Sequence, residues 1–205
     1  MSSFKFTELL IATKNKGKIT EFKELFKDLP IKLISISDLE QISEPEESGS
    51  SFEENAKIKA SEYAQISGLY AFSDDSGLEV DALNGLPGVH SARYAGKDAD
   101  HAVKIAKLLA ELDATGDEMR IASFTSVIAL AAPDGKVIYT AKGICSGRIA
   151  NAPAGSNGFG YDPVFIPDGY DLSFGQLPDS VKGNISHRSR ASSQFIGFLS
   201  DYLKN

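Results

Sequence analysis

The sequence predicts an α/β or α+β domain built on a mixed β-sheet, and three observations support this fold class. The apolar run at 9–12 predicts a buried strand, and the apolar spacing over 19–26 predicts the helix that follows it. Residues 121–131 and 137–149 are rich in β-forming side chains on either side of Pro133-Asp134-Gly135, which predicts a long hairpin. Because the two hairpin strands are antiparallel neighbours, we expect a mixed rather than a purely parallel sheet.

The remaining elements follow from local signals. Ser51 and Glu54 have the spacing of a capping box, so a helix should begin there, and Gly68 should end it. We expect further strands at 31–36, 69–72, 78–83 and 164–166, and further helices at 98–112 and from Ser189 onward.

Composition and net charge limit the kinds of protein that this chain can be. The 205 residues carry a net charge of −7 with 42% hydrophobic residues, which is typical of a soluble globular chain of one domain, and a two-lobed domain is compatible with this length. An acidic chain argues against broad binding to nucleic acid or to an anionic membrane. Cys145 is the only cysteine, so no internal disulfide can form. With no signal peptide or membrane-spanning segment in the sequence, we expect a cytoplasmic location.

A basic turn near the start of the chain is the first candidate site. The run Thr13-Lys14-Asn15-Lys16-Gly17-Lys18 lies where the first strand leads into the first helix, a place that favours anions. It is not a P-loop, because Thr13 replaces the first glycine and Ile19 replaces the hydroxyl residue. The alternative is a solvated turn whose lysines contribute only to solubility.

Acidic residues form the second candidate site. Asp74 and Asp75 come at the end of a predicted buried strand, where α/β sheets bind ligands. Two neighbouring carboxylates ionise together most easily around a cation, and Mg²⁺ suits a phosphate substrate. Glu46, Glu47 and Glu54 are further candidate ligands. The alternatives are an ordinary acidic turn at 74–75 and a favourable helix N-terminus at Glu54.

Two more runs could bind a nucleobase. Phe159-Gly160-Tyr161-Asp162 offers an aromatic face and a carboxylate that accepts from ring N–H groups. Lys182-Gly183-Asn184-Ile185-Ser186-His187-Arg188 offers two cations, a hydroxyl and an imidazole. The alternatives are core aromatics at a strand entry and ordinary helix capping. Together the four runs describe the parts of a Mg²⁺–nucleotide site.

Six motifs in this order carry a resemblance to a known family. They are Thr13-x-Asn15-x-x-Lys18, Phe52-x-Glu54-Asn55-Ala56-x-x-Lys59-Ala60, Ser73-Asp74-Asp75-Ser76-Gly77-Leu78, Pro87-Gly88-Val89-x-Ser91-Ala92-Arg93-Tyr94, Gly158-Phe159-Gly160-Tyr161-Asp162-Pro163 and Ser186-His187-Arg188. The chain resembles the inosine triphosphate pyrophosphatase family, also called XTP/dITP diphosphatases, over nearly its whole length.

The resemblance implies a single catalytic domain over 1–205, with a Maf/Ham1-type fold. Two lobes would surround a long, curved mixed sheet flanked by helices, with the active-site cleft between them, usually in a homodimer. It also implies Mg²⁺-dependent hydrolysis of ITP, dITP and XTP to the monophosphate and pyrophosphate, which cleanses the nucleotide pool.

The resemblance also implies a role for each matching residue. Residues 13–18 would hold the phosphates, Asp75 would be the general base or a metal ligand, and Glu46 would be the other ligand. Lys59, Ser76 and Lys182 would contact the substrate, and residues 159–162 with His187 and Arg188 would hold the base. Lys14 and Ser189 replace glycines that the family often has, and neither change removes a functional group. The choice of Glu46 over Glu47 rests on spacing from Gly49.

Two other functions remain open. One is a Maf-like nucleotide pyrophosphatase that acts on pyrimidine or modified nucleotides. The other is a nucleotide-binding regulator without catalysis, and the intact acids argue against it because a sensor needs no base beside Mg²⁺.

Overall fold

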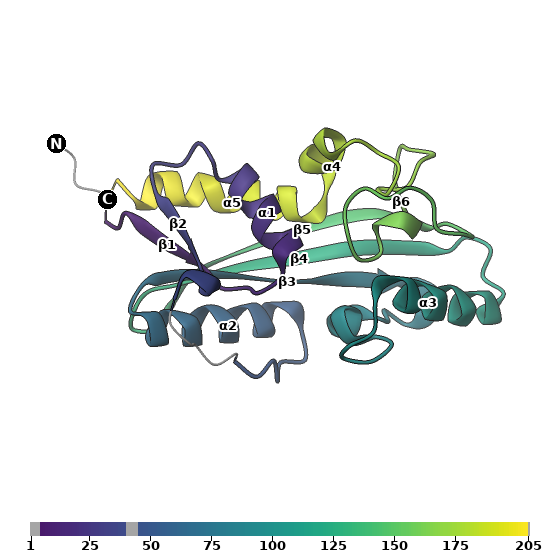
Figure 1. Cartoon of the computed structure of the whole chain (residues 1–205), viewed down its shortest axis with the longest axis horizontal. Helices are drawn as coiled ribbons and strands as arrows, with labels where there is room; N and C mark the ends of the chain where they lie inside the picture. The colour runs from purple at the N-terminus through teal and green to yellow at the C-terminus, as the bar shows by residue number, and fades with distance from the viewer. Residues whose placement is uncertain (1–4, 40–44, 205) are drawn as a thin grey trace. The chain divides into compact units, whose positions relative to one another are not determined.

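The computed structural model describes residues 5–39 and 45–204. In chain order the longer elements are β1 (Glu8–Ile11), α1 (Lys16–Leu25), β2 (Lys32–Ser35), α2 (Phe52–Ser67), β3 (Tyr70–Val80), α3 (His101–Thr115), β4 (Ile121–Ala131), β5 (Val137–Ile149), β6 (Phe165–Pro167), α4 (Asp179–Ile185) and α5 (His187–Tyr202) (Figure 1). Short 3₁₀ turns lie at Ile36–Asp38, Asp81–Leu83, Gly88–Arg93 and Asp162–Val164.

The six strands form one sheet in the order β2-β1-β3-β4-β5-β6. β1 pairs in parallel with both β2 and β3, whereas β5 and β6 are antiparallel. This pairing confirms the predicted mixed sheet. The predicted bounds of the hairpin strands β4 and β5 are also correct.

The chain divides into two compact units. Unit 1 comprises Met1–Asp75, Ser126–Gly143 and Arg188–Asn205, and unit 2 comprises Ser76–Thr125 and Ile144–His187. The long strands β3, β4 and β5 each contribute residues to both units. In the described part of the chain, no helix is long and apolar enough to cross a membrane.

In unit 1, helices pack on both faces of the strands. Figure 1 shows α1 and α5 on one face and α2 on the other. The rings of Phe22, Phe26 and Phe195 surround Phe72 of β3, with ring centroids 5.0–5.5 Å from its own. The predicted cap of α2 is confirmed, because Ser51 Oγ accepts from the Glu54 N–H at 3.2 Å.

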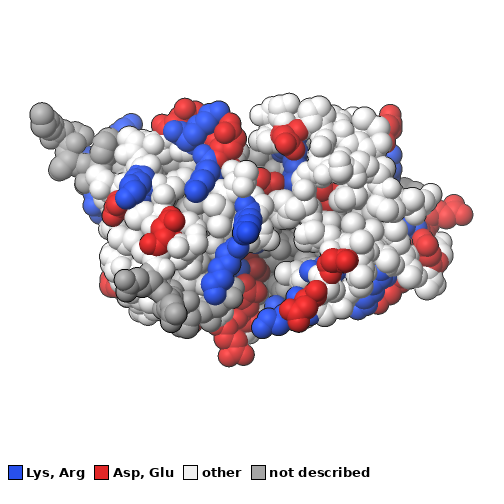
Figure 2. Space-filling view, viewed as in Figure 1, with Lys and Arg blue, Asp and Glu red and all other residues white. Residues whose placement is uncertain are grey.

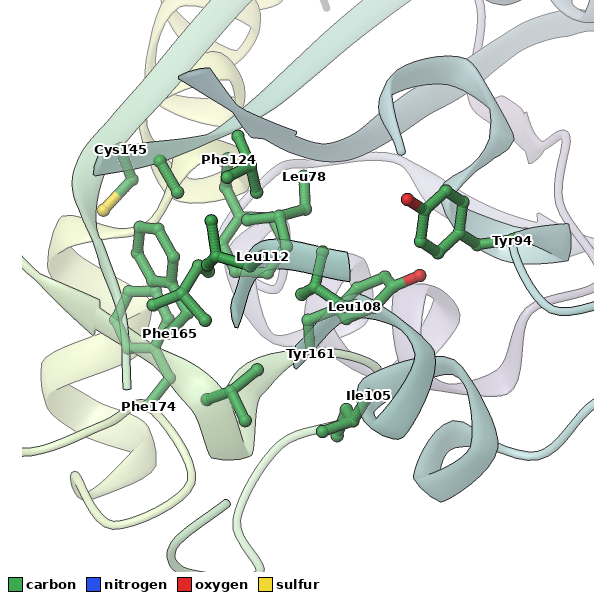
Figure 3. Packing of buried hydrophobic residues seen from close by; sticks show 14 of the residues in the cluster. Leu78, Tyr94, Ile105, Leu108, Leu112, Phe124, Cys145, Tyr161, Phe165 and Phe174 are labelled. Atoms are coloured by element: carbon green, nitrogen blue, oxygen red, sulfur yellow. The ribbon is translucent and has the colours of Figure 1, made fainter. Parts of the chain in front are cut away.

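Unit 2 has its own apolar core. Figure 3 shows Leu108 and Leu112 of α3 at its centre, with Phe165 on one side and Tyr94 on the other. Leu108 and Leu112 are fully buried. The sole cysteine, Cys145, is buried in the same cluster.

Some predicted boundaries were wrong. The chain runs as one strand through 70–80, where two strands separated by an acidic turn were expected. The polar side chains at the middle of β3 are tolerated because they have partners; Ser73 Oγ, for example, donates to the Ala56 carbonyl at 2.5 Å. Helix α4 was not predicted, and α5 begins at His187, two residues before the expected Ser189.

Charged side chains are interspersed on the surface, and Figure 2 shows lysines and arginines next to aspartates and glutamates on the face that it displays. A few charged groups are buried instead. The most heavily paired of them, Asp74, lies in β3 and is 1% exposed.

A buried ion cluster surrounds Asp74 in unit 1. Its Oδ2 lies 2.9 Å from Lys18 Nζ and 3.2 Å from Arg188 Nη2, and its Oδ1 accepts from Ser126 Oγ at 2.5 Å. Arg188, itself 2% exposed, also donates to Glu21. The cluster therefore joins α1, β3, β4 and α5 through charged hydrogen bonds.

Burial and the surrounding positive charges have opposite effects on the pKa of Asp74. Burial alone would raise its pKa, but the charges of Lys18 and Arg188 and the Ser126 hydrogen bond hold the pKa well below its ordinary value. A buried charge with such partners is stable, whereas removal of one partner leaves buried charge that is less fully compensated.

We expect Asp74→Asn to lower the free energy of unfolding at pH 7 by about 3–5 kcal/mol, because Lys18 loses its counter-charge and Arg188 keeps only Glu21. The folded-state pKa of Asp74 lies below the unfolded value of about 3.9, so its ionised form stabilises the fold above that value. Its contribution should then fade as the pH drops below the unfolded value toward the folded one. Urea unfolding between pH 7 and pH 2 should show the gap between wild type and variant nearly constant down to about pH 4 and narrowing below it. A gap that stays constant over this range would contradict this assignment.

Candidate active site

The basic turn forms the N-terminus of α1, as predicted. Asn15 caps the helix, since its Oδ1 accepts from the Lys18 N–H at 3.1 Å, and Thr13 Oγ1 accepts from the Asn15 N–H at 3.2 Å. Lys14 and Lys16 are exposed, whereas the Lys18 side chain is only 13% exposed. The turn therefore places two solvated cations and one fixed cation at the positive end of a helix dipole.

Asp75 points to the opposite face of β3 from Asp74, because successive side chains in a strand alternate. Its Oδ1 lies 2.8 Å from Lys59 Nζ of α2, which also contacts Glu47 Oε1 at 2.9 Å. Lys59 thus bridges two carboxylates. Its ammonium also donates to the main-chain carbonyl of Asp74, as does that of Lys18, both at 3.2 Å.

The two faces of β3 give the adjacent aspartates different ionisation. Burial raises the pKa of Asp75 above its ordinary value, against the lowering effect of Lys59 and Lys18. For Lys59, burial would lower the pKa, but Asp75 and Glu47 outweigh it and raise the pKa. Burial lowers the pKa of Lys18 despite its contact with Asp74. A buried acid with a raised pKa is suited to accept a proton.

The carboxylates of this site could hold a metal ion. Glu47 contacts the same ammonium as Asp75, whereas Glu46 is exposed, so the geometry favours Glu47 over the predicted Glu46. Among the described residues, no group of three acidic, histidine or cysteine side chains is arranged to bind a metal. Two carboxylates would fit an ion that takes its other oxygens from phosphates and water, as Mg²⁺ commonly does.

In unit 2, the predicted base-binding run is a tight turn organised by Asp162. The Oδ2 atom of Asp162 accepts from the Phe159 N–H and from Lys182 Nζ, both at 2.7 Å. Lys182 Nζ lies 4.8 Å from the centre of the Phe159 ring. Gly158 has φ +70°, and a Cβ there would lie 2.0 Å from Asp162 Oδ2, so the turn requires glycine.

The other predicted base-binding residues have varied environments. The ring of His187 is buried and stacks on Phe124 with centroids 4.7 Å apart. Tyr161 lies in the apolar core of unit 2 and donates to the Ser91 carbonyl at 3.1 Å. Arg188 belongs to the Asp74 cluster of unit 1, so its described contacts support an anchoring role.

A cavity of about 420 Å³ lies in unit 2 between α3 and residues 153–163. Phe159 and Gly160 line it, together with Ile105 and Leu109. Tyr161, Asp162, Lys182 and His187 are not among its lining residues.

The structure thus brings the predicted residues together in two groups. Unit 1 collects Lys18, Lys59, Glu47 and Asp75, and unit 2 collects Phe159, Asp162 and Lys182. Ser76 is half-buried in β3, one residue after Asp75. Sequence reasoning missed Glu21 and Ser126, whose contacts join residues distant in the chain.

Comparison with known proteins places the chain among named relatives. It is 46% identical to a dITP/XTP pyrophosphatase of Geobacter sulfurreducens, over 96% of each chain. It is 45% identical to the dITP/XTP pyrophosphatase of Oceanobacillus iheyensis, over 94% of this chain and 98% of that one.

Comparison with solved structures also matches the chain to proteins of this kind. The structure of a HAM1 protein from Coxiella burnetii matches with a TM-score of 0.86 and 42% identity, covering 96% of this chain and all of that one. The Staphylococcus aureus Ham1 protein matches with a TM-score of 0.84 and 44% identity, covering 95% and 98%. The Ham1 family model matches residues 9–198. The resemblance drawn from the six motifs is therefore confirmed, and the chain belongs to the Ham1 family.

Proposed function

We propose that this protein is a nucleoside triphosphate pyrophosphatase that hydrolyses the non-canonical purine nucleotides dITP, ITP and XTP. The products are the nucleoside monophosphate and pyrophosphate, and the cellular role is to cleanse the nucleotide pool. The observation that carries the proposal is the position of Asp75, a buried carboxylate that shares the Lys59 ammonium with Glu47. Relatives at 44–47% identity bear the name dITP/XTP pyrophosphatase.

The phosphate-binding groups of the proposal come from unit 1. The α1 N-terminus with Thr13–Lys18 would hold the triphosphate, and Lys18 and Lys59 would neutralise part of its charge. Their positions are set before substrate binds, because both ammonium groups donate to the Asp74 carbonyl. Preorganised cations of this kind stabilise the charge that develops on a leaving pyrophosphate.

The proposed reaction is attack by water on the α-phosphorus. The new bond joins the water oxygen to that phosphorus, the bond from the α-phosphorus to the bridging oxygen breaks, and pyrophosphate leaves. Asp75 would accept the proton of the water, a role that its raised pKa favours. A bound Mg²⁺ would supply Lewis-acid activation of the phosphate and the water. Asp75 and Glu47 are the residues that would hold it.

The base-binding groups of the proposal come from unit 2. Phe159 and Gly160 would offer an aromatic face and close backbone approach, and Lys182 and His187 would offer hydrogen bonds to a 6-oxo purine. Adenine presents an amino group at that position, so it would leave buried donors unpaired, which can discriminate by several powers of ten. Asp162 would act mainly by holding Phe159 and Lys182 in place.

We also propose that the protein depends on Mg²⁺, forms a homodimer and is located in the cytoplasm. Family resemblance supports the ion and the homodimer, and the single cysteine is consistent with a reducing compartment. A Maf-like specificity remains the alternative, and the names of the relatives favour purine substrates.

The first test is pyrophosphate release from a panel of ITP, dITP, XTP, GTP, ATP, dTTP and UTP with Mg²⁺, for wild type and Asp75→Asn. We expect the wild type to prefer ITP, dITP and XTP. Loss of the base should lower kcat by about 10²–10⁴-fold, while ITP binding survives in calorimetry. Orthophosphate as the product, or a preference for dTTP or UTP, would refute the proposed function. Unchanged turnover in Asp75→Asn would refute the role of Asp75.

The neighbouring glutamates provide a matched pair of variants. Glu47→Gln should raise the Mg²⁺ concentration needed for half-maximal turnover by about 10–100-fold, because it removes a carboxylate beside Asp75. Glu46→Gln, at the exposed neighbouring position, should behave as wild type. A magnesium titration of initial rates measures both. The opposite order of effects would restore Glu46 as the ligand.

A further inference from the structure

Asn55 connects the loop that carries Glu47 to the strand that carries Asp75. It lies in the first turn of α2 and is 0% exposed. Its Oδ1 accepts from the Gly49 N–H at 2.8 Å, and its Nδ2 donates to Asp75 Oδ2 at 3.3 Å. The buried side-chain amide of Asn55 therefore accepts a hydrogen bond from the loop and donates one to the carboxylate of Asp75.

The loop lies directly on the start of α2 at this point. A Cβ on Gly49 would be 2.6 Å from Asn55 Oδ1 and 2.7 Å from Glu54 Cβ, so only glycine fits without movement. Glu54 Oε2 accepts from the Ser50 N–H at 2.7 Å, which fixes the next residue of the loop as well. Glu47 precedes Gly49 by two residues, so its main chain is held close to this anchor.

Asp75 is held at both oxygens. Lys59 donates to Oδ1 at 2.8 Å, and Asn55 donates to Oδ2 at 3.3 Å. Two donors from one helix fix the plane of the carboxylate. The Lys59 contact is a charge pair, whereas Asn55 adds direction without adding charge, so its role is to orient the group.

We propose that Asn55 is a positioning residue that sets the orientation of Asp75 and its separation from Glu47. The inference rests on the proposed function, in which these two carboxylates act together. Both described hydrogen bonds of the Asn55 side chain, to Gly49 and to Asp75, lie within unit 1. Groups of this kind behind a catalytic or metal-binding residue typically change activity or metal affinity by about 10–100-fold when they are removed.

Two variants separate the two contacts. Asn55→Asp keeps the size of the side chain and the acceptor for Gly49, but it replaces the donor to Asp75 with an oxygen. Asn55→Ala removes both contacts. The matched control is Ser73→Ala, which removes a buried hydrogen bond between the same two elements, from Ser73 Oγ to the Ala56 carbonyl. That bond touches neither Asp75 nor Gly49.

The experiment measures kcat and KM for ITP, Mn²⁺ binding without nucleotide, and hydrogen exchange at the Gly49 amide. We expect Asn55→Asp and Asn55→Ala to lower kcat by about 10–100-fold with KM for ITP nearly unchanged, and Asn55→Ala to weaken Mn²⁺ binding as well. Exchange at Gly49 should be about tenfold faster in Asn55→Ala than in Ser73→Ala. The control should keep the wild-type kcat and Mn²⁺ affinity even where its urea midpoint falls.

Three results would overturn the inference: an unchanged kcat in Asn55→Asp, an equal loss of kcat in Ser73→Ala, or unchanged Gly49 exchange in Asn55→Ala. If the wild-type protein releases no pyrophosphate from ITP or XTP, the proposed function fails. The hydrogen-exchange rate of the Gly49 amide then still shows whether Asn55 fixes the loop that carries Glu47.

Discussion

The buried carboxylate of Asp74 is the interaction on which unit 1 depends. Three segments distant in sequence supply its partners, which are Lys18 of α1, Ser126 of β4 and Arg188 of α5. A carboxylate in this position is stable only because each oxygen is bonded and two cations face it. The same contacts fix Lys18 at the start of α1, so the basic turn at 13–18 is held beside Asp74.

The alternation of a β-strand gives two adjacent aspartates opposite roles. Asp74 faces α1 and α5, where its partners keep it ionised and bonded. Asp75 faces α2, where burial raises its pKa and Lys59 links it to Glu47. Asp74 therefore holds the framework, and the proposed function assigns the chemistry to Asp75, although both have the same side chain. The main-chain carbonyl of Asp74 joins the two faces by accepting from Lys18 and Lys59.

Local patterns in the sequence predicted the features that depend on neighbouring residues. The strand-to-helix turn at 13–18, the Ser51 cap and the β4–β5 hairpin are of this kind. The missed features depend on distant partners. The acidic run in β3 stays extended because Asp74 is bonded to Ser126 and Arg188. These two residues lie 52 and 114 positions away in the chain, so local patterns do not reveal them. Spacing alone likewise did not separate Glu46 from Glu47, and the contact that favours Glu47 is made to Lys59, 12 residues away in the chain.

A double-mutant cycle between Asp74 and Lys18 tests the central claim most directly. Unfolding free energies of wild type, Asp74→Asn, Lys18→Met and the double variant give the coupling between the two groups. Each single change removes one member of the pair and leaves the other buried, whereas the double change removes both. The account predicts a coupling of about 1.5 kcal/mol or more, with the double variant more stable than the sum of the single losses allows. Additivity within about 0.5 kcal/mol would contradict it.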